Sequence, residues 1–187
     1  TPHPFYLTYN SATMDVVDDP QYVKIMVKKK DSGTKTNVAA GNASLAGAVY
    51  AITYKENGVD KTVQKTTNSS GILYFTNVPL GEIKIQEISA PVGYKLDSTV
   101  HTYNVTSDKV TSAVYEMEPE DFTEDVFKGK ISLTKQIEML GADAQLEQGT
   151  EYQVYLKSAG SYANAKDTER DYLVTGADGK ATTKDLP

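Results

Sequence analysis

In two segments of the chain, apolar residues occupy every second position, as they do on the buried face of a β-strand. The last residue on that face is charged in both segments. Side chains alternate between the two faces of a β-strand, so Lys29 shares a face with Ile25 and Val27. By the same count Glu87 shares a face with the two isoleucines that precede it. A buried charge without a partner is strongly unfavourable. We therefore expect Lys29 and Glu87 to point inward and to form a buried ion pair or hydrogen bond.

Strands joined by tight turns must position these two side chains. Segments rich in β-branched residues and tyrosine alternate with short stretches of Gly, Asn, Asp and Pro. The clearest predicted strands cover residues 49–55, 59–66, 72–76 and 82–88. The first two are joined across Asn57-Gly58, a sequence typical of a tight hairpin. Helix signals are nearly absent, so the sequence predicts an all-β fold.

The same order of signals occurs twice along the chain. Ile25, Val27 and Lys29 recur 106 positions later as Ile131, Leu133 and Lys135; Gly47 and Tyr50 recur 102 positions later as Gly149 and Tyr152; Gly71 and Pro79 recur 108 positions later as Gly179 and Pro187. Small changes in the offset are expected from loop insertions and deletions. We expect tandem sandwich modules, with a first module at 22–119 and a second, truncated module at 128–187.

Two other segments complete the predicted domain organisation. An acidic run, 116–125, lies between the two modules, and its self-repulsion and central proline favour an extended linker at 120–127. Calcium binding is the alternative for this run, but the acids lack the ligand spacing and the turn glycine of a calcium loop. Residues 1–21 form an N-terminal segment that we interpret as the end of a preceding domain.

Composition excludes several classes of function. The net charge of −6 is the wrong sign for a surface that neutralises phosphates, so nucleic acid is not an expected partner. The chain has no cysteine, which removes disulfides, thiolate metal sites and cysteine nucleophiles. His3 and His101 are far apart and have no metal-site or catalytic spacing, so we expect no metal or cofactor. No apolar run is long enough to cross a bilayer, and no signal peptide is visible, so the chain is interpreted as a piece of a longer protein.

Several motifs together resemble the Cna B-type or SpaA-like modules of Gram-positive pilins and adhesins. They are the first predicted strand at 25–31, Leu-Ala-Gly-Ala-Val-Tyr at 45–50, Gly-Ile-Leu-Tyr-Phe at 71–75, Val-Pro-Leu-Gly at 78–81, and the segment 85–96. In the last of these, Glu87 is followed after three residues by Pro91 and then by Gly-Tyr-Lys-Leu. The resemblance covers about 22–118 and, incompletely, 128–187. It implies Ig-like, prealbumin-like β-sandwiches.

The resemblance also implies an intramolecular isopeptide bond. In this family a first-strand lysine attacks an Asn or Asp side chain on the last strand while a glutamate assists. Such chemistry requires a buried lysine that can be neutral, beside a carboxyl group that the same surroundings keep protonated. Lys29 and Glu87 match the lysine and the glutamate, and Lys135 is the candidate lysine of the second module.

The acceptor is the point at which this sequence departs from the family. The expected closing strand, 111–119, has no Asn or Asp. Asn104 lies upstream, but its neighbours Tyr103 and Val105 are expected to take the inward face. Glu116 is the remaining candidate on the closing strand. Because a glutamate acceptor is not the family pattern, we expect Lys29 and Glu87 to pair without a covalent bond.

These observations favour a structural function over catalysis of a reaction on a diffusible substrate. The expected role is a stalk module of a Gram-positive surface adhesin or pilin-like protein, extracellular and anchored to the cell wall through signals outside this chain. Its partners would be neighbouring domains of the same protein. One alternative is direct binding of a host glycan or matrix protein, through end loops or the insertion at 158–170. A weaker alternative is an accessory domain of a carbohydrate-active enzyme.

Overall fold

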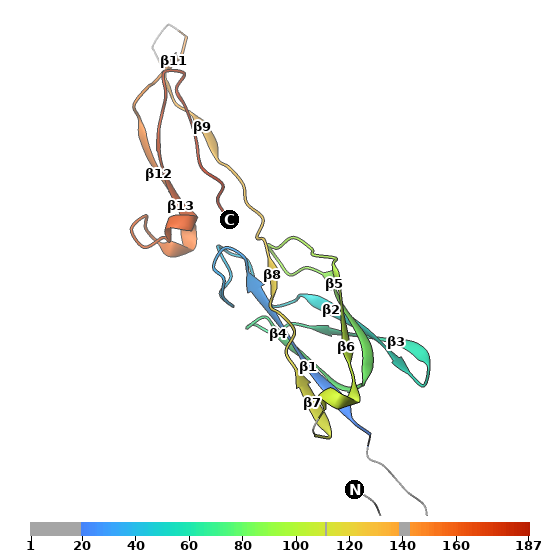
Figure 1. Cartoon of the computed structure of the whole chain (residues 1–187). Helices are drawn as coiled ribbons and strands as arrows, with labels where there is room; N and C mark the ends of the chain where they lie inside the picture. The colour runs from blue at the N-terminus through green and yellow to red at the C-terminus, as the bar shows by residue number, and fades with distance from the viewer. Residues whose placement is uncertain (1–19, 111, 139–142) are drawn as a thin grey trace, which may run out of the picture.

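The computed structural model describes residues 20–110, 112–138 and 143–187. Two β-rich modules lie end to end along the chain (Figure 1). Most of the N-terminal segment assigned to 1–21 lies outside the described residues. Every element in the described ranges is a strand or a short 3-10 helix, which confirms the predicted all-β class.

The first module is a sandwich of two sheets. Its strands are β1 (Tyr22–Asp31), β2 (Val49–Glu56), β3 (Val59–Thr66), β4 (Ile72–Pro79), β5 (Gly81–Ser89), β6 (Val100–Val105), β7 (Val114–Met117) and β8 (Phe122–Glu124), with a 3-10 turn η1 (Ser107–Lys109) before β7. One sheet has the order β4-β1-β7, with β8 also paired to β1, and the other has the order β3-β2-β5-β6. This arrangement confirms the expected sandwich.

Alternation along β1 and β5 determines what enters the core between the sheets. In β1 every second residue from Val23 to Asp31 is buried, and in β5 the buried residues are Ile83, Ile85 and Glu87. The apolar members of both sets belong to one cluster with Tyr50, Ile52 and Phe75. The core is therefore apolar along most of the module and polar at the end where β1 and β5 present their charged residues.

The closing edge of the first module differs from the expectation. Residues 22–25 of β1 pair in parallel with β7, and residues 29–31 pair in parallel with β8. The linker predicted at 120–127 is therefore wrong for residues 122–124, which form a strand of the first module. Pro119 cannot donate a hydrogen bond and interrupts the ladder, but the chain continues alongside β1.

Charge explains why the acidic run stays against β1. The outward face of β1 carries Lys24, Lys28 and Lys30, and these pair with Glu116, Glu118 and Asp121 respectively. The acids were expected to repel one another and to extend into solvent. Instead, the row of lysines on β1 neutralises them.

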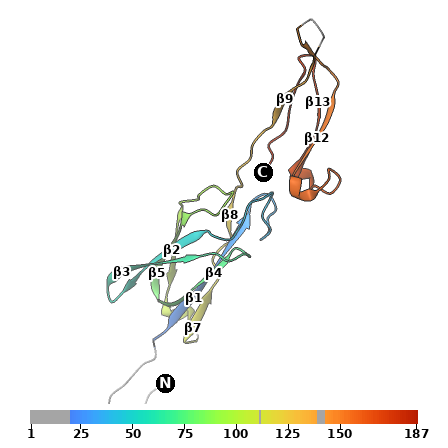
Figure 2. The same cartoon turned by 180° about the vertical axis from the view of Figure 1, so that it is seen from behind.

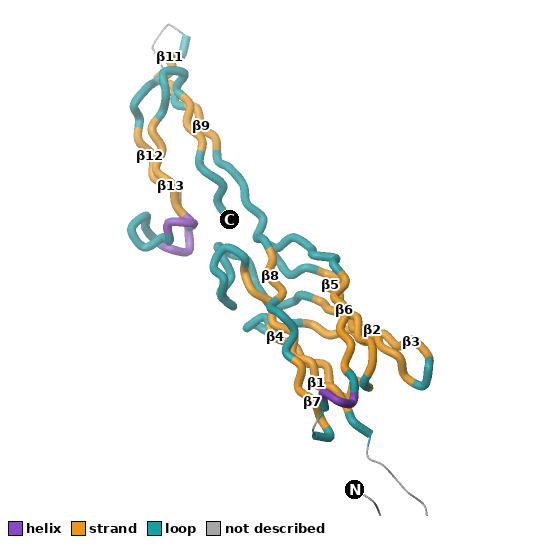
Figure 3. The backbone as a smooth tube through the Cα atoms, in the orientation of Figure 1, coloured by secondary structure: helices purple, strands orange, loops and turns teal. Residues whose placement is uncertain are grey.

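The second module contains β9 (Ser132–Thr134), β10 (Gln136–Ile137), β11 (Gln145–Leu146), β12 (Glu151–Tyr155), β13 (Arg170–Val174) and β14 (Lys180–Thr182), with the 3-10 turns η2 (Lys157–Ala159) and η3 (Asp167–Glu169) (Figure 3). β9 pairs with β14 as β1 pairs with β4, and β12 pairs with β13 as β2 pairs with β3.

Hydrogen bonds repeat between the two modules. The hydroxyl of Thr67 donates to the carbonyl of Leu45 at 2.7 Å, and that of Thr175 donates to the carbonyl of Glu147 at 2.7 Å. Likewise, the amide of Lys29 donates to the carbonyl of Gly71 at 2.8 Å, as that of Lys135 does to Gly179 at 2.7 Å. The described part of the second module thus corresponds to β1–β4 of the first.

Candidate functional site: a buried lysine between two glutamates

Lys29 lies at the polar end of the core, completely shielded from solvent. Its Nζ is 2.9 Å from Oε1 of Glu87, which is 3 % exposed. It also contacts Oε2 of Glu124, which is 5 % exposed. Three strands, β1, β5 and β8, therefore place one amine between two carboxyl groups in the interior. We call these three residues the lysine–glutamate cluster.

Aromatic residues enclose the lysine–glutamate cluster. The hydroxyl of Tyr50 lies 3.3 Å from Oε1 of Glu124 and can donate a hydrogen bond to it. The ring of Tyr94 lies 5.5 Å from Nζ of Lys29, within the range of a cation–π contact. The ring of Phe122 packs on Tyr50 with centroids 5.3 Å apart. These rings exclude water, which strengthens every electrostatic interaction within the cluster.

The surroundings shift the proton affinity of Glu124. Burial and then the adjacent carboxyl of Glu87 raise the pKa of Glu124 to about 7, although Lys29 acts in the opposite direction. Its Oε2 contacts Nζ of Lys29. Oε2 of Glu87 accepts a hydrogen bond from the backbone amide of Asp97 at 3.3 Å. Burial and the neighbouring carboxyl group therefore favour the protonated form of Glu124.

The arrangement contains the groups that amide formation requires. An amine lies next to a carboxyl group with raised proton affinity, and a second carboxylate hydrogen-bonded to the amine can accept its proton. Preorganised neighbours of this kind react with effective molarities of about 10⁵–10⁸ M. The same groups also form a stable ionic arrangement if no bond is made.

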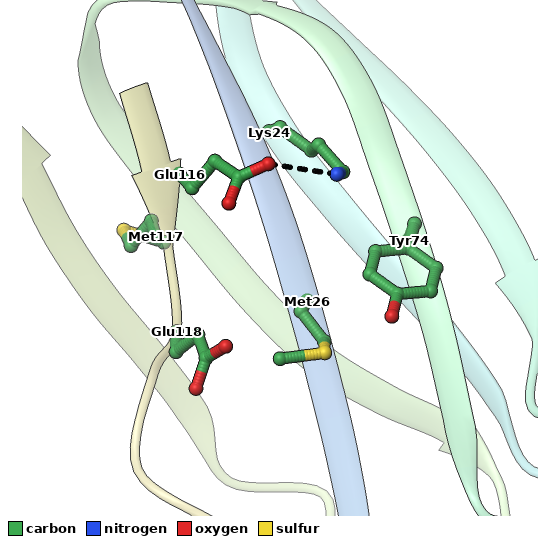
Figure 4. Close-up of a pocket in the computed structure, with 6 residues that line it drawn as sticks. All are labelled: Lys24, Met26, Tyr74, Glu116, Met117 and Glu118. Atoms are coloured by element: carbon green, nitrogen blue, oxygen red, sulfur yellow. Dashed lines mark hydrogen bonds and ion pairs between the residues drawn. The ribbon is translucent and has the colours of Figure 1, made fainter. Parts of the chain in front are cut away.

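Glu116, the acceptor candidate on the predicted closing strand, lies elsewhere. It is on the outer face of β7, where its Oε1 accepts a hydrogen bond from Nζ of Lys24 at 2.8 Å (Figure 4). Its side chain is 72 % exposed. The hollow that Figure 4 shows is also lined by Met26, Tyr74, Met117 and Glu118. Glu116 pairs in register with Lys24 and is exposed like Val114, whereas Lys29 lies further along β1 on its buried face.

Glu124 is the residue that sequence reasoning missed. From the sequence, the closing strand is predicted to end at Pro119, and a linker is predicted beyond it. A signal was nevertheless present, because Phe122 and Glu124 occupy alternate positions, and both are buried on one face of β8. This is the same apolar-then-carboxylate pattern that singled out Glu87.

Lys135, the candidate lysine of the second module, has different surroundings. Its Nζ lies 3.2 Å from Oε2 of Glu147, and both side chains are about a third exposed. The described residues of the second module include no counterparts of β5 and β8. Lys135 therefore forms a partly solvated ion pair here.

The structure offers no sign of a metal site or a membrane span within its described ranges. No group of three His, Cys, Asp or Glu side chains is arranged there to hold a metal ion. None of the helices in that part of the chain has the length and apolar character needed to cross a bilayer.

Comparison with known proteins finds similar proteins in several bacteria. The trypsin-resistant surface T6 protein of Streptococcus pyogenes serotype M6 is 35 % identical over 91 residues, which are 49 % of this chain and 15 % of that protein. The Bacillus anthracis TIE protein matches 91 % of this chain with 26 % of its own, at 24 % identity and a TM-score of 0.57. A C-terminal fragment of the pilus adhesin SpaC from Lactobacillus rhamnosus GG matches 89 % of this chain with 72 % of its own, at 18 % identity and a TM-score of 0.46.

The likeness to the TIE protein concerns the fold alone, and this chain spans only a small part of the first two relatives. The family assignment rests on a separate match. Residues 23–119, just over half of the chain, match the SpaA domain, a prealbumin-like fold domain. The chain belongs to the SpaA family of prealbumin-like fold domains.

Proposed function

We propose that this chain is a structural stalk segment of an extracellular surface protein, and that the lysine–glutamate cluster fastens its first module against extension. The T6 relative is named a surface protein, which supports a location on the cell surface. The observation that carries the proposal is the buried contact of Lys29 on β1 with Glu124 on β8. It joins the first and last strands of the module.

The direction of the strands explains why this contact matters under tension. β1 is parallel to β7 and β8, so the chain enters the module at one end and leaves it at the other (Figure 1). Tension along the stalk pulls these strands in opposite directions and loads their hydrogen bonds together. A bond between Lys29 and Glu124 would carry the load directly, and the residues between them would bear none.

The proposed fastening is an amide between Nζ of Lys29 and Cδ of Glu124. The neutral amine attacks the protonated carboxyl group of Glu124, and Glu87 accepts a proton from the nitrogen. Glu87 then returns this proton to the departing hydroxyl group, so that one water leaves and one amide forms. The expectation of a non-covalent pair rested on the lack of an acceptor in 111–119. Glu124 supplies a carboxyl group at the place where the resemblance implies Asn or Asp.

Single-molecule stretching tests the mechanical role. With the bond, the first module should not lengthen between residues 29 and 124. Lys29→Met removes the amine, and the same module should then release about 300 Å of chain, from about 3.3 Å for each extended residue. Exposed Lys55→Met is the matched control and should behave as the parent. Release of the full length by the parent would contradict the proposal.

Binding assays test the alternative of a host-ligand module. A stalk segment should show no binding to glycans or matrix proteins when the isolated chain is used. Saturable binding that is lost when the insertion at 158–170 is shortened would instead favour the ligand-binding function.

A further inference from the structure

A buried aspartate organises the loop that follows β1. Oδ1 of Asp31 accepts hydrogen bonds from the amides of Gly33 and Thr34, both at 2.8 Å. Oδ2 accepts one from the amide of Ala40 at 3.1 Å and one from the hydroxyl of Tyr94 at 2.7 Å. Asp31 is fully buried. Four donors around one carboxylate fix residues 33–40, and the next residue, Gly41, is thereby held in place.

The chain that leaves the first module is bonded to the same region. The amide of Lys95 donates to the carbonyl of Asp125 at 3.0 Å, and the amide of Phe127 donates to the carbonyl of Gly93 at 2.8 Å. Gly93 in turn lies so close to Ala43 that an added Cβ would be 2.7 Å from the Cβ of Ala43. The loop after β1 and residues 125–127 are therefore both held against the turn around Gly93, and the exit from the module is not a free tether.

The organised loop contacts the second module through Gly41. Its amide donates a hydrogen bond at 2.9 Å to Oε1 of Glu169, on η3. Glu169 is 6 % exposed, and Nζ of Lys166 lies 3.1 Å from the same oxygen. Gly41 has φ of +59°, and a Cβ there would lie 3.2 Å from the Cβ of Pro187. In both views the loop after β1 extends toward the second module (Figures 1 and 2).

We propose that the loop at 33–44 is a docking surface for the second module of the same chain, with Glu169 as the anchoring residue. Neighbouring domains normally move relative to one another unless a specific interface prevents it. Here the nearly buried carboxylate of Glu169 accepts a hydrogen bond from the amide of Gly41, which the hydrogen bonds to Asp31 hold in place. Residues 125–127, which lead toward the second module, are hydrogen-bonded to the first. The two modules consequently keep one relative orientation. This inference deepens the proposed stalk function and rests on it for its biological meaning.

The contact between Gly41 and Glu169 also gives a structural role to part of the insertion at 158–170, the segment named above as a candidate ligand-binding loop. Arg170 donates to the carbonyl of Tyr162 at 2.8 Å, and its guanidinium lies 4.9 Å from the centroid of the Tyr162 ring. The insertion is thus folded on itself next to Glu169. Its C-terminal end faces the first module through the Gly41 contact.

Pulsed electron paramagnetic resonance measures the proposed rigidity. The chain has no cysteine, so Gln64→Cys and Gln153→Cys allow one exposed label on each module of the otherwise complete chain. We expect a narrow distance distribution. Glu169→Ala should broaden it about twofold, because the modules regain the mobility usual for linked domains. Gly41→Ala should have the same effect, and Glu169→Gln, which keeps an acceptor oxygen, should remain closer to the parent.

Gly58→Ala is the matched control for Gly41→Ala. Gly58 also has a positive φ, +80°, but it lies in the β2–β3 hairpin with nothing within 4 Å of an added Cβ. It should leave the distribution narrow. A parent distribution as broad as that of Glu169→Ala, or no broadening in Glu169→Ala while circular dichroism shows a folded chain, would overturn the proposal. Neither readout depends on the Lys29–Glu124 bond, so failure here is distinguishable from failure of the proposed function.

Discussion

Replacing Asp31 by alanine removes the acceptor around which the loop after β1 is built. The change leaves four donors without their partner. The amides of Gly33 and Thr34 are only partly buried, and water can replace the carboxylate there. The amide of Ala40 and the hydroxyl of Tyr94 are buried and cannot be rescued in this way.

The magnitude follows from these two buried donors. Each unsatisfied buried donor costs about 1–3 kcal/mol, so Asp31→Ala should lower the free energy of unfolding by about 3 kcal/mol. Tyr94→Phe removes one donor and leaves the carboxylate with three others, so a loss of about 1 kcal/mol is expected. Urea unfolding, followed by circular dichroism, measures both values. Exposed Asp60→Ala is the control and should not change the midpoint measurably.

The pH dependence provides an independent readout of Asp31. Burial by itself would raise the pKa of Asp31, but hydrogen bonds from Tyr94 and the backbone outweigh it and hold the pKa below 3.8. A carboxyl group with a lowered pKa in the folded state contributes stability above its unfolded pKa and loses it as the pH falls. Asp31→Ala should therefore reduce the loss of stability below pH 3.8. An unfolding free energy for Asp31→Ala within about 0.5 kcal/mol of the parent would refute the reasoning.

Three further substitutions separate the contributions of other sites. In Lys29→Met no amide can form, so Glu124 keeps a free carboxyl group whose pKa is raised by burial and by Glu87 with no cation to oppose them; stability should fall as the pH rises from 4.5 to 7 in urea titrations, and a flat profile would contradict the burial of Glu124. Thr67→Val removes the hydroxyl that bonds both Leu45 and Ala48 and should cost about 2 kcal/mol, whereas exposed Thr62→Val should have little effect in the same assay. Glu116→Gln should leave the thermal midpoint unchanged at moderate salt, because its ion pair is exposed; a large decrease would assign it a structural role.

Alternation in the sequence was sufficient to predict the strands and the inward orientation of two charged residues. The period of two places Lys29 with Ile25 and Val27, and the buried positions of β1 follow it without interruption. The two-fold repeat of glycines and strand residues reappears as repeated hydrogen bonds, in which the amides of Lys29 and Lys135 donate to the carbonyls of Gly71 and Gly179. The alternation is local, because it depends on residues close together in the sequence, and the repeat can be recognised because the same residues occur twice.

The features that sequence reasoning did not provide depend on distant segments. The sequence places Glu124 in a predicted linker, because Pro119 and the acidic run are typical of the end of a sheet. Only the register of β8 with β1 brings its carboxyl group to Lys29. The contact of Gly41 with Glu169 joins residues 128 positions apart, and no spacing rule connects them. Partners that meet through tertiary packing leave little local signal for sequence analysis.

The intact mass of the folded and purified chain tests the central claim most directly. We predict a mass lower by one water than the sequence requires, together with a proteolytic fragment in which Lys29 and Glu124 are joined. Lys29→Met should show the full mass of its own sequence. Glu87→Gln should also show the full mass or a slow loss of water, because the proton acceptor is absent. A full mass for the parent chain would contradict the covalent bond and would leave Lys29, Glu87 and Glu124 as a buried ionic cluster.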